Sequence, residues 1–310
     1  MKEKPEFIGR KYSDDEKEKL TDILKEWHKE AGKPLEGELE KTKEELDIIQ
    51  SVNLWVQAEL KHLGIDEYEF IEPDHIHFLP EDIYKQKFGD FDAKAHFRST
   101  EDVIYINKDA IDTKVRLFSV LVHETVHYTS KSKFYTIPGD YVYNSRTGYR
   151  ITSPWKEGNA KNKLRGFNEI MTDITTLMIL SRNAKTLESK FGIPKEDLVG
   201  PIYAYMEYGP MVYAIVEKTA KDRGVNKNQV VEELERGQFS ANILALKHIE
   251  KSFGPGSLEI LSFLQAFDKD EDNKKIEDMI QEFFTTEDET ERERLRTEIK
   301  NVASTFTDRV

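Results

Sequence analysis

The chain has 310 residues, a net charge of −13 at pH 7 and no cysteine. The acidic balance argues against a protein that binds nucleic acid or an anionic membrane surface. Without cysteine there can be no disulfide and no cysteine nucleophile, and a chain of this length is expected to form about two domains or lobes.

The sequence also bears on location. No apolar run is long enough to cross a bilayer, and the first six residues lack the apolar core of a signal peptide. We therefore expect a cytoplasmic protein with neither a membrane partner nor a nucleic-acid partner. An exported bacterial protein could show the same lack of cysteine.

Two helices are predicted in the first 66 residues. Ser13 and Glu16 have the spacing of a capping box, and apolar residues follow at helical spacing until Gly32 and Pro34. A second helix is expected from residue 38 to 63, with Gly64 as its C-terminal stop. These helices can pack on the rest of the protein or cover a cleft as a prosegment, and we favour packing.

Three strands are predicted next, at residues 74–79, 93–98 and 102–107, the last two forming a hairpin that turns at 99–101. The run 103–106 is the candidate edge strand that could pair with an extended peptide; the alternative is an ordinary internal strand. His75 and His77 project to one face of the first strand, but no third ligand at fixed spacing accompanies them, so a second metal site is disfavoured.

Residues 123–127 read His-Glu-Thr-Val-His, at the end of a helix that is apolar almost all round and is therefore expected to be buried. His123 and His127 lie on one face of that helix, within reach of one metal ion. Glu124 beside them can take a proton from a metal-bound water. The alternative is a pair of core histidines beside an ion-paired glutamate.

A stretch rich in Gly, Pro, Asn and Ser follows and is interpreted as a loop. An amphipathic helix then carries Glu169 and Asp173, four residues apart and so on one face. Because catalytic zinc usually has three protein ligands, Glu169 is the candidate third ligand. Asp173 could accept a hydrogen bond from the ring of His123 and orient it. The alternative is two solvated acids.

The pattern His-Glu-x-x-His followed by Asn-Glu-x-x-x-Asp resembles the gluzincin branch of the zincin metallopeptidases, over residues 94 to 182. The third-histidine extension of the metzincins is missing. The resemblance implies Zn²⁺ as the cofactor, with the metal ligands His123, His127 and Glu169, the general base Glu124 and the supporting acid Asp173.

Zincins often add a tyrosine or histidine that stabilises the oxyanion of the transition state. Our candidates are Tyr208 and then Tyr149. For either residue, packing in the protein interior is the alternative interpretation.

From residue 183 the chain is predicted to be mostly helical, with breaks at Gly, Pro, Asn or acidic residues. The expected fold class is α+β. A zincin-like catalytic core at residues 67–182, with a small mixed β-sheet and the HExxH helix, lies between a helical N-terminal region at 1–66 and a helical C-terminal lobe at 183–310.

The expected function is that of a zinc metallopeptidase, a hydrolase acting on a peptide or protein substrate. No Gly-rich exopeptidase motif precedes the zinc-binding helix, which favours an endopeptidase over an aminopeptidase. One alternative is a catalytically idle zincin-fold protein-binding module. Another is a helical interaction protein in which the motif is coincidental.

Overall fold

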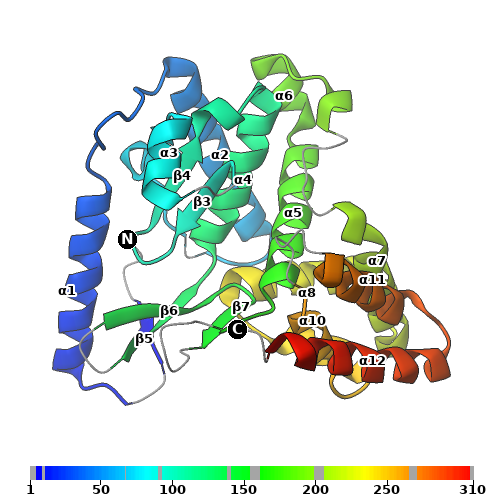
Figure 1. Ribbon diagram of the computed structural model, residues 1–310. Helices are drawn as coiled ribbons and strands as arrows, with labels where there is room; N and C mark the ends of the chain where they lie inside the picture. Colours follow the sequence, from blue (N-terminus) through cyan, green and yellow to red (C-terminus); the bar gives the residue numbers. More distant parts are fainter. Residues whose placement is uncertain are drawn as a thin grey trace. The chain divides into compact units, whose positions relative to one another are not determined.

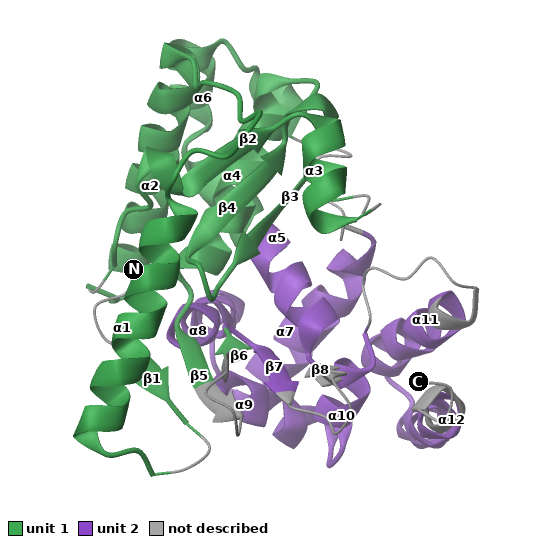
Figure 2. Ribbon diagram, turned by 60° about the vertical axis from the view of Figure 1, so that its left-hand side comes forward, with its two compact units in different colours: residues 1–147, 174–203 green, residues 148–173, 204–310 purple. Residues whose placement is uncertain are grey.

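The computed structural model describes residues 5–8, 11–66, 68–89, 93–137, 141–153, 161–198, 206–264 and 271–307. It is a mixed α+β protein with small sheets, as predicted (Figure 1). Two compact units comprise residues 1–147 with 174–203, and 148–173 with 204–310 (Figure 2). Helix α5 (Arg165–Arg182) contributes residues to both units. The three-part division made from the sequence stays a prediction.

Two capped helices, α1 (Asp14–Ala31) and α2 (Lys43–His62), begin the first unit. Ser13 and Glu16 form the predicted capping box of α1, and Thr42 forms a second one with Glu45 at the start of α2. In each box the N-cap hydroxyl accepts a backbone N–H that would otherwise lack a partner. Both predicted helices are therefore confirmed, with α2 beginning five residues later than expected.

Within the described residues of this unit, a three-stranded sheet has the order β2 (Ile76–Leu79), β4 (Val103–Asn107), β3 (Ala95–Arg98). β2 is parallel to β4 and β3 is antiparallel to it, which confirms the predicted hairpin. The prediction that residues 103–106 form an edge strand is wrong. β4 is the central strand and all five of its residues are buried, as expected of a strand covered on both faces. The outer strand next to it is β3.

The two faces of this sheet contact different helices. Val103 and Tyr105 project to one face and pack against Tyr84 of α3 (Glu81–Phe88). Phe97 lies opposite Ile104, on the other face, and its ring contacts Tyr128 of α4 (Lys114–Thr129), with centroids 5.8 Å apart. Because side chains alternate along a strand, α3 and α4 cover opposite faces (Figures 1 and 2). Outer strand β3 therefore packs directly on α4.

The stretch predicted as a loop after α4 contains strands instead, so that prediction is wrong. In the first unit β1 (Glu6–Phe7) is parallel to β5 (Ser132–Ile137), and β5 is antiparallel to β6 (Tyr141–Thr147). In the second unit β7 (Arg150–Ser153) is antiparallel to β8 (Lys161–Lys163). The glycines and polar residues that suggested a loop separate short strands, whose pairing is not visible in local sequence.

The remaining described chain is mostly helical, as predicted. The first unit contains α6 (Ala184–Phe191). The second contains α7 (Gly209–Arg223), α8 (Lys227–Ser240), α9 (Leu244–Phe253), α10 (Ser257–Ser262), α11 (Glu271–Thr285) and α12 (Glu289–Thr307). None of the helices in the described part of the chain has the length and apolar character needed to span a membrane.

Replacing Thr42 by Ala removes the hydroxyl that caps α2 while the rest of the helix is unchanged. We expect the free energy of unfolding to fall by about 1 kcal/mol, measured by urea denaturation. Thr297→Ala is the control, because Thr297 is an exposed threonine inside α12 and should change stability by less than about 0.5 kcal/mol. Equal effects of the two substitutions would contradict a capping role.

Candidate metal centre

Helix α4 brings polar residues into the protein interior. It begins at Thr113, whose hydroxyl accepts the backbone N–H of Arg116, and its buried positions include Leu117, Phe118 and Leu121. Phe118 stacks on Trp55 of α2 with ring centroids 5.3 Å apart. The prediction of a buried helix is confirmed. Glu124 and His127 of the motif are buried with this helix, and His123 is half-buried.

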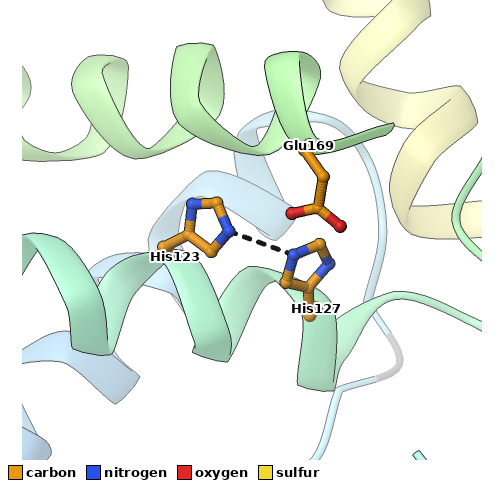
Figure 3. Close-up of side chains that lie close together, drawn as sticks. All are labelled: His123, His127 and Glu169. Atoms are coloured by element: carbon orange, nitrogen blue, oxygen red, sulfur yellow. Dashed lines mark hydrogen bonds between the residues drawn. The ribbon is translucent and has the colours of Figure 1, made fainter. Parts of the chain in front are cut away.

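His123 and His127 point their Nε2 atoms toward each other, at a distance of 3.1 Å (Figure 3). Two imidazole nitrogens that bind one tetrahedral zinc at about 2.0–2.1 Å are about 3.3 Å apart. The spacing of four residues on one helix thus sets the two nitrogens close to the separation that a shared metal requires.

Glu169 of α5 completes the group. One ligand atom from each of His123, His127 and Glu169 can be chosen so that all three lie within 4.8 Å of one another. In Figure 3 the carboxylate of Glu169 points toward the two imidazoles. Two imidazole nitrogens and one carboxylate oxygen form a donor set of catalytic zinc sites, and this set also suits other divalent transition metals. The residues present therefore fit a metal ion of this class.

The candidate base Glu124 lies on the same helix and is only 8 % exposed. Burial, and then the negative charge of Glu124, raise the pKa of Tyr84. The Tyr84 hydroxyl lies 2.8 Å from Nδ1 of His96 on β3. Burial lowers the pKa of His96 to about 4, and the positive charges of Arg98 and Lys87 act in the same direction. The ring is therefore neutral at pH 7, and its Nδ1 can accept a hydrogen bond from the Tyr84 hydroxyl.

Tyr84 and His96 were missed by sequence reasoning. They come from α3 and β3, and the packing of α3 on one face of the sheet brings them together. No spacing rule links residues on two different elements, whereas a helix repeat links His123 to His127.

The first turn of α5, which carries Glu169, is held by buried hydrogen bonds within the second unit. Asn168 accepts the backbone N–H of Tyr149 through Oδ1, at 2.8 Å. Thr172 donates through its hydroxyl to the backbone oxygen of Asn168, at 2.8 Å, and Gln238 of α8 donates to that hydroxyl at 2.5 Å. The side chain of Glu169 therefore projects from a firmly anchored turn.

Gly148 makes this anchoring possible. Its φ is +56°, and a Cβ built there would lie 2.6 Å from Oδ1 of Asn168. A side chain at this position would be strained by the backbone conformation and would displace the acceptor of the Tyr149 N–H.

Positive charge lies close to Glu169. Burial lowers the pKa of Arg150, the charge of Arg165 lowers it further, and the carboxylate of Glu169 acts in the opposite direction. The guanidinium of Arg150 thus interacts electrostatically with this candidate ligand, a feature that the sequence did not predict.

The two candidate oxyanion donors are buried, and their hydroxyls have partners. Tyr149 donates to the backbone oxygen of Leu234 at 2.7 Å. Tyr208 donates to Oε2 of Glu277 at 2.7 Å. Either hydroxyl would have to give up its bond to serve an oxyanion, so this role stays a prediction for both.

Asp173 lies one helical turn after Glu169 and is 9 % exposed. The alternative interpretation from the sequence was a solvated acid, and a side chain this buried does not fit it. Its predicted action on the ring of His123 stays a prediction.

Comparison with known protein families, with curated proteins and with solved structures finds no match. The function of the chain therefore has to be inferred from its own residues and their arrangement.

We expect the purified protein, after incubation with zinc, to hold about one ion per chain, because one ligand atom from each of the three residues lies within 4.8 Å of the other two. Glu169→Ala should lower this occupancy clearly. Elemental analysis after desalting measures it, with Glu188→Ala as a control, since Glu188 is an exposed acid on α6. Equal metal content in the wild type and in Glu169→Ala would show that Glu169 is not a metal ligand.

Asp173→Ala should weaken zinc affinity by about 10- to 100-fold, as expected when a residue that orients a ligand is lost. Competition with a chromophoric chelator gives the affinity. Asp197→Ala, which changes an exposed acid, should leave the affinity unchanged. An unaltered affinity in Asp173→Ala would show that Asp173 does not support the metal ligands.

Proposed function

We propose that the chain is a zinc-dependent peptidase with a zincin-like core of the gluzincin type. The observation that carries this proposal is the convergence of His123, His127 and Glu169, with Glu124 on the same buried helix as the two histidines. This is the arrangement that the gluzincin resemblance implies.

Zn²⁺ held by these three ligands would supply a Lewis acid that polarises the scissile carbonyl and acidifies water. Glu124 takes the proton from the attacking water while the water oxygen bonds to the carbonyl carbon. When the C–N bond breaks, Glu124 passes this proton to the leaving amine. Because His123 and His127 would hold the metal, Glu124 is the residue of the motif that remains to act as the base.

Outer strand β3 supports a role in binding extended substrate. It packs on α4 through the contact of Phe97 with Tyr128, and in the described sheet β4 lies on one side of it only. An extended peptide could add to β3 through backbone hydrogen bonds, which depend little on side chains. Binding along a strand suits cleavage within a chain, so we favour an endopeptidase over an aminopeptidase.

The alternative function is a catalytically idle zincin-fold module that binds a protein. Such a module would need no base beside the metal ligands. The presence of Glu124 in this chain therefore argues against it. A protein that binds zinc but cleaves nothing would favour this alternative.

Glu124→Ala should keep the metal and lose at least about 100-fold in peptidase activity, because it removes the proton acceptor without removing a ligand. Mass spectrometry of a mixed peptide library incubated with zinc-loaded protein measures cleavage of many different sequences at once. Glu188→Ala should cleave like the wild type. Cleavage by Glu124→Ala at the wild-type rate would contradict the mechanism.

A further inference from the structure

The two ring nitrogens of His96, on outer strand β3, have different surroundings. Nδ1 lies 2.8 Å from the hydroxyl of Tyr84 on α3. Tyr84 is fully buried, and within the described residues Nδ1 is the one hydrogen-bond partner of its hydroxyl. A buried hydroxyl whose hydrogen has no acceptor destabilises the fold. The Tyr84 hydroxyl therefore donates to Nδ1.

This bond defines the tautomer of His96. Burial, and then the charges of Arg98 and Lys87, lower the pKa of His96 to about 4, so at pH 7 the ring is neutral and carries one N–H. Because Nδ1 is an acceptor, the hydrogen is on Nε2. The ring is half-buried, and Nε2 has no hydrogen-bond partner in the part of the chain that the structure describes. It is not a buried atom either. His96 thus presents an N–H donor that a ligand can reach.

A positive charge lies beside this donor. Nζ of Lys87 on α3 lies 5.3 Å from the centre of the Tyr105 ring and 5.8 Å from that of Phe88. Both rings contact His96, with centroids 5.5 Å and 4.1 Å away. Lys87 is exposed and makes no ion pair with another described residue. Its charge is therefore available to a ligand that approaches His96.

Arg98 is a second cation on this face of the sheet. It follows His96 by two residues on β3, so the two side chains project to the same side. Nη1 of Arg98 lies 2.9 Å from Oε1 of Glu101, and its charge is thus already paired. Lys87 is the cation near His96 that remains to attract an anion.

The register of β3 relates these groups to a bound peptide. His96 lies opposite Tyr105 of β4, and in the described sheet no strand pairs with the other side of β3. If a peptide adds there, the residue directly opposite His96 projects to the same face, with Cβ atoms about 4.5–5.5 Å apart. Burial, and then the charge of Glu124, raise the pKa of Tyr84. The bond between Tyr84 and His96 is therefore within electrostatic reach of the candidate base.

We propose that His96 and Lys87 select peptides that carry an acidic side chain, Asp or Glu, opposite His96. Nε2–H of His96 donates to a carboxylate oxygen, and the ammonium group of Lys87 balances its charge. The two residues select different properties. His96 requires an acceptor, which Gln also supplies, whereas Lys87 requires a negative charge, which Gln lacks. This selection deepens the proposed peptidase function and rests on it, because it concerns the peptide that adds to β3.

Cleavage of a mixed peptide library by the zinc-loaded protein tests the charge preference. For the wild type we expect Glu and Asp to exceed Gln and Asn about fivefold at one position relative to the cleaved bond. Lys87→Glu should lose or reverse this preference at unchanged metal content. Lys85→Glu is the matched control, because Lys85 is an exposed residue of α3 and residues two apart on a helix do not face each other. An identical preference in the wild type and in Lys87→Glu would exclude Lys87.

Binding separates this inference from the peptidase proposal. Fluorescence anisotropy gives the affinity of zinc-loaded Glu124→Ala for labelled peptides Thr-Val-X-Val-Thr with blocked ends, in which X is Glu, Gln or Leu; β-branched residues favour extended chains. We expect affinity to fall in that order, by about fivefold at each step. Adding Lys87→Glu should remove the step between Glu and Gln.

The outcomes differ for the two proposals. The expected order of affinities without any cleavage by the wild type would support the inference and contradict the peptidase function. Equal affinities for the Glu and Leu peptides, or no binding of any peptide, would overturn the inference even where the library is cleaved.

The donor role of His96 has its own variants. In the Glu124→Ala background, replacing both Tyr84 and His96 by Phe removes the donor and leaves no buried hydroxyl unpaired. The step between Gln and Leu should then disappear, whereas Tyr84→Phe alone should keep it. A persistent step in the double replacement would rule out His96. If that variant does not fold, ring ¹⁵N NMR of the wild type decides, since a hydrogen on Nδ1 rather than Nε2 at pH 7 would remove the donor.

Discussion

Burial of helix α4 is the constraint on which the candidate centre depends. Apolar side chains such as Phe118 and Leu121 hold the helix in the interior. Glu124 and His127 are buried with them, and His123 is half-buried. Polar groups in such a place destabilise the fold unless they are paired. A metal ion shared by His123, His127 and Glu169 would meet that need, and in this sense folding and metal binding would be linked.

The candidate third ligand, Glu169, depends on a different kind of support. Glu169 gains its position from the buried amide of Asn168 and from the glycine before Tyr149, because these fix the turn from which its side chain projects. Ligands held by neighbouring hydrogen bonds keep their geometry when the metal leaves, whereas ligands on mobile loops do not.

Local signals in the sequence predicted the local features well. The capping box at Ser13, the hairpin between β3 and β4 and the shared helix face of His123 and His127 all depend on residues a few positions apart. Features built by distant residues were missed. The prediction of an edge strand at β4 was wrong because its pairing with β2 is not encoded locally. The strands after α4 were not predicted because the Gly, Pro, Asn and Ser residues of this stretch indicated a loop. His77 and Glu38, separated by 39 residues, meet only in the folded chain.

The shortness of β3 has a consequence for self-association. A strand that exposes unpaired backbone groups can pair with the same strand of another molecule, and long, flat, apolar edges lead to aggregation. β3 has only four residues, and Arg98 at its end is exposed. A second copy could form only a few backbone bonds with so short a strand. The strand can thus stay open to a flexible peptide while it disfavours pairing between two folded molecules.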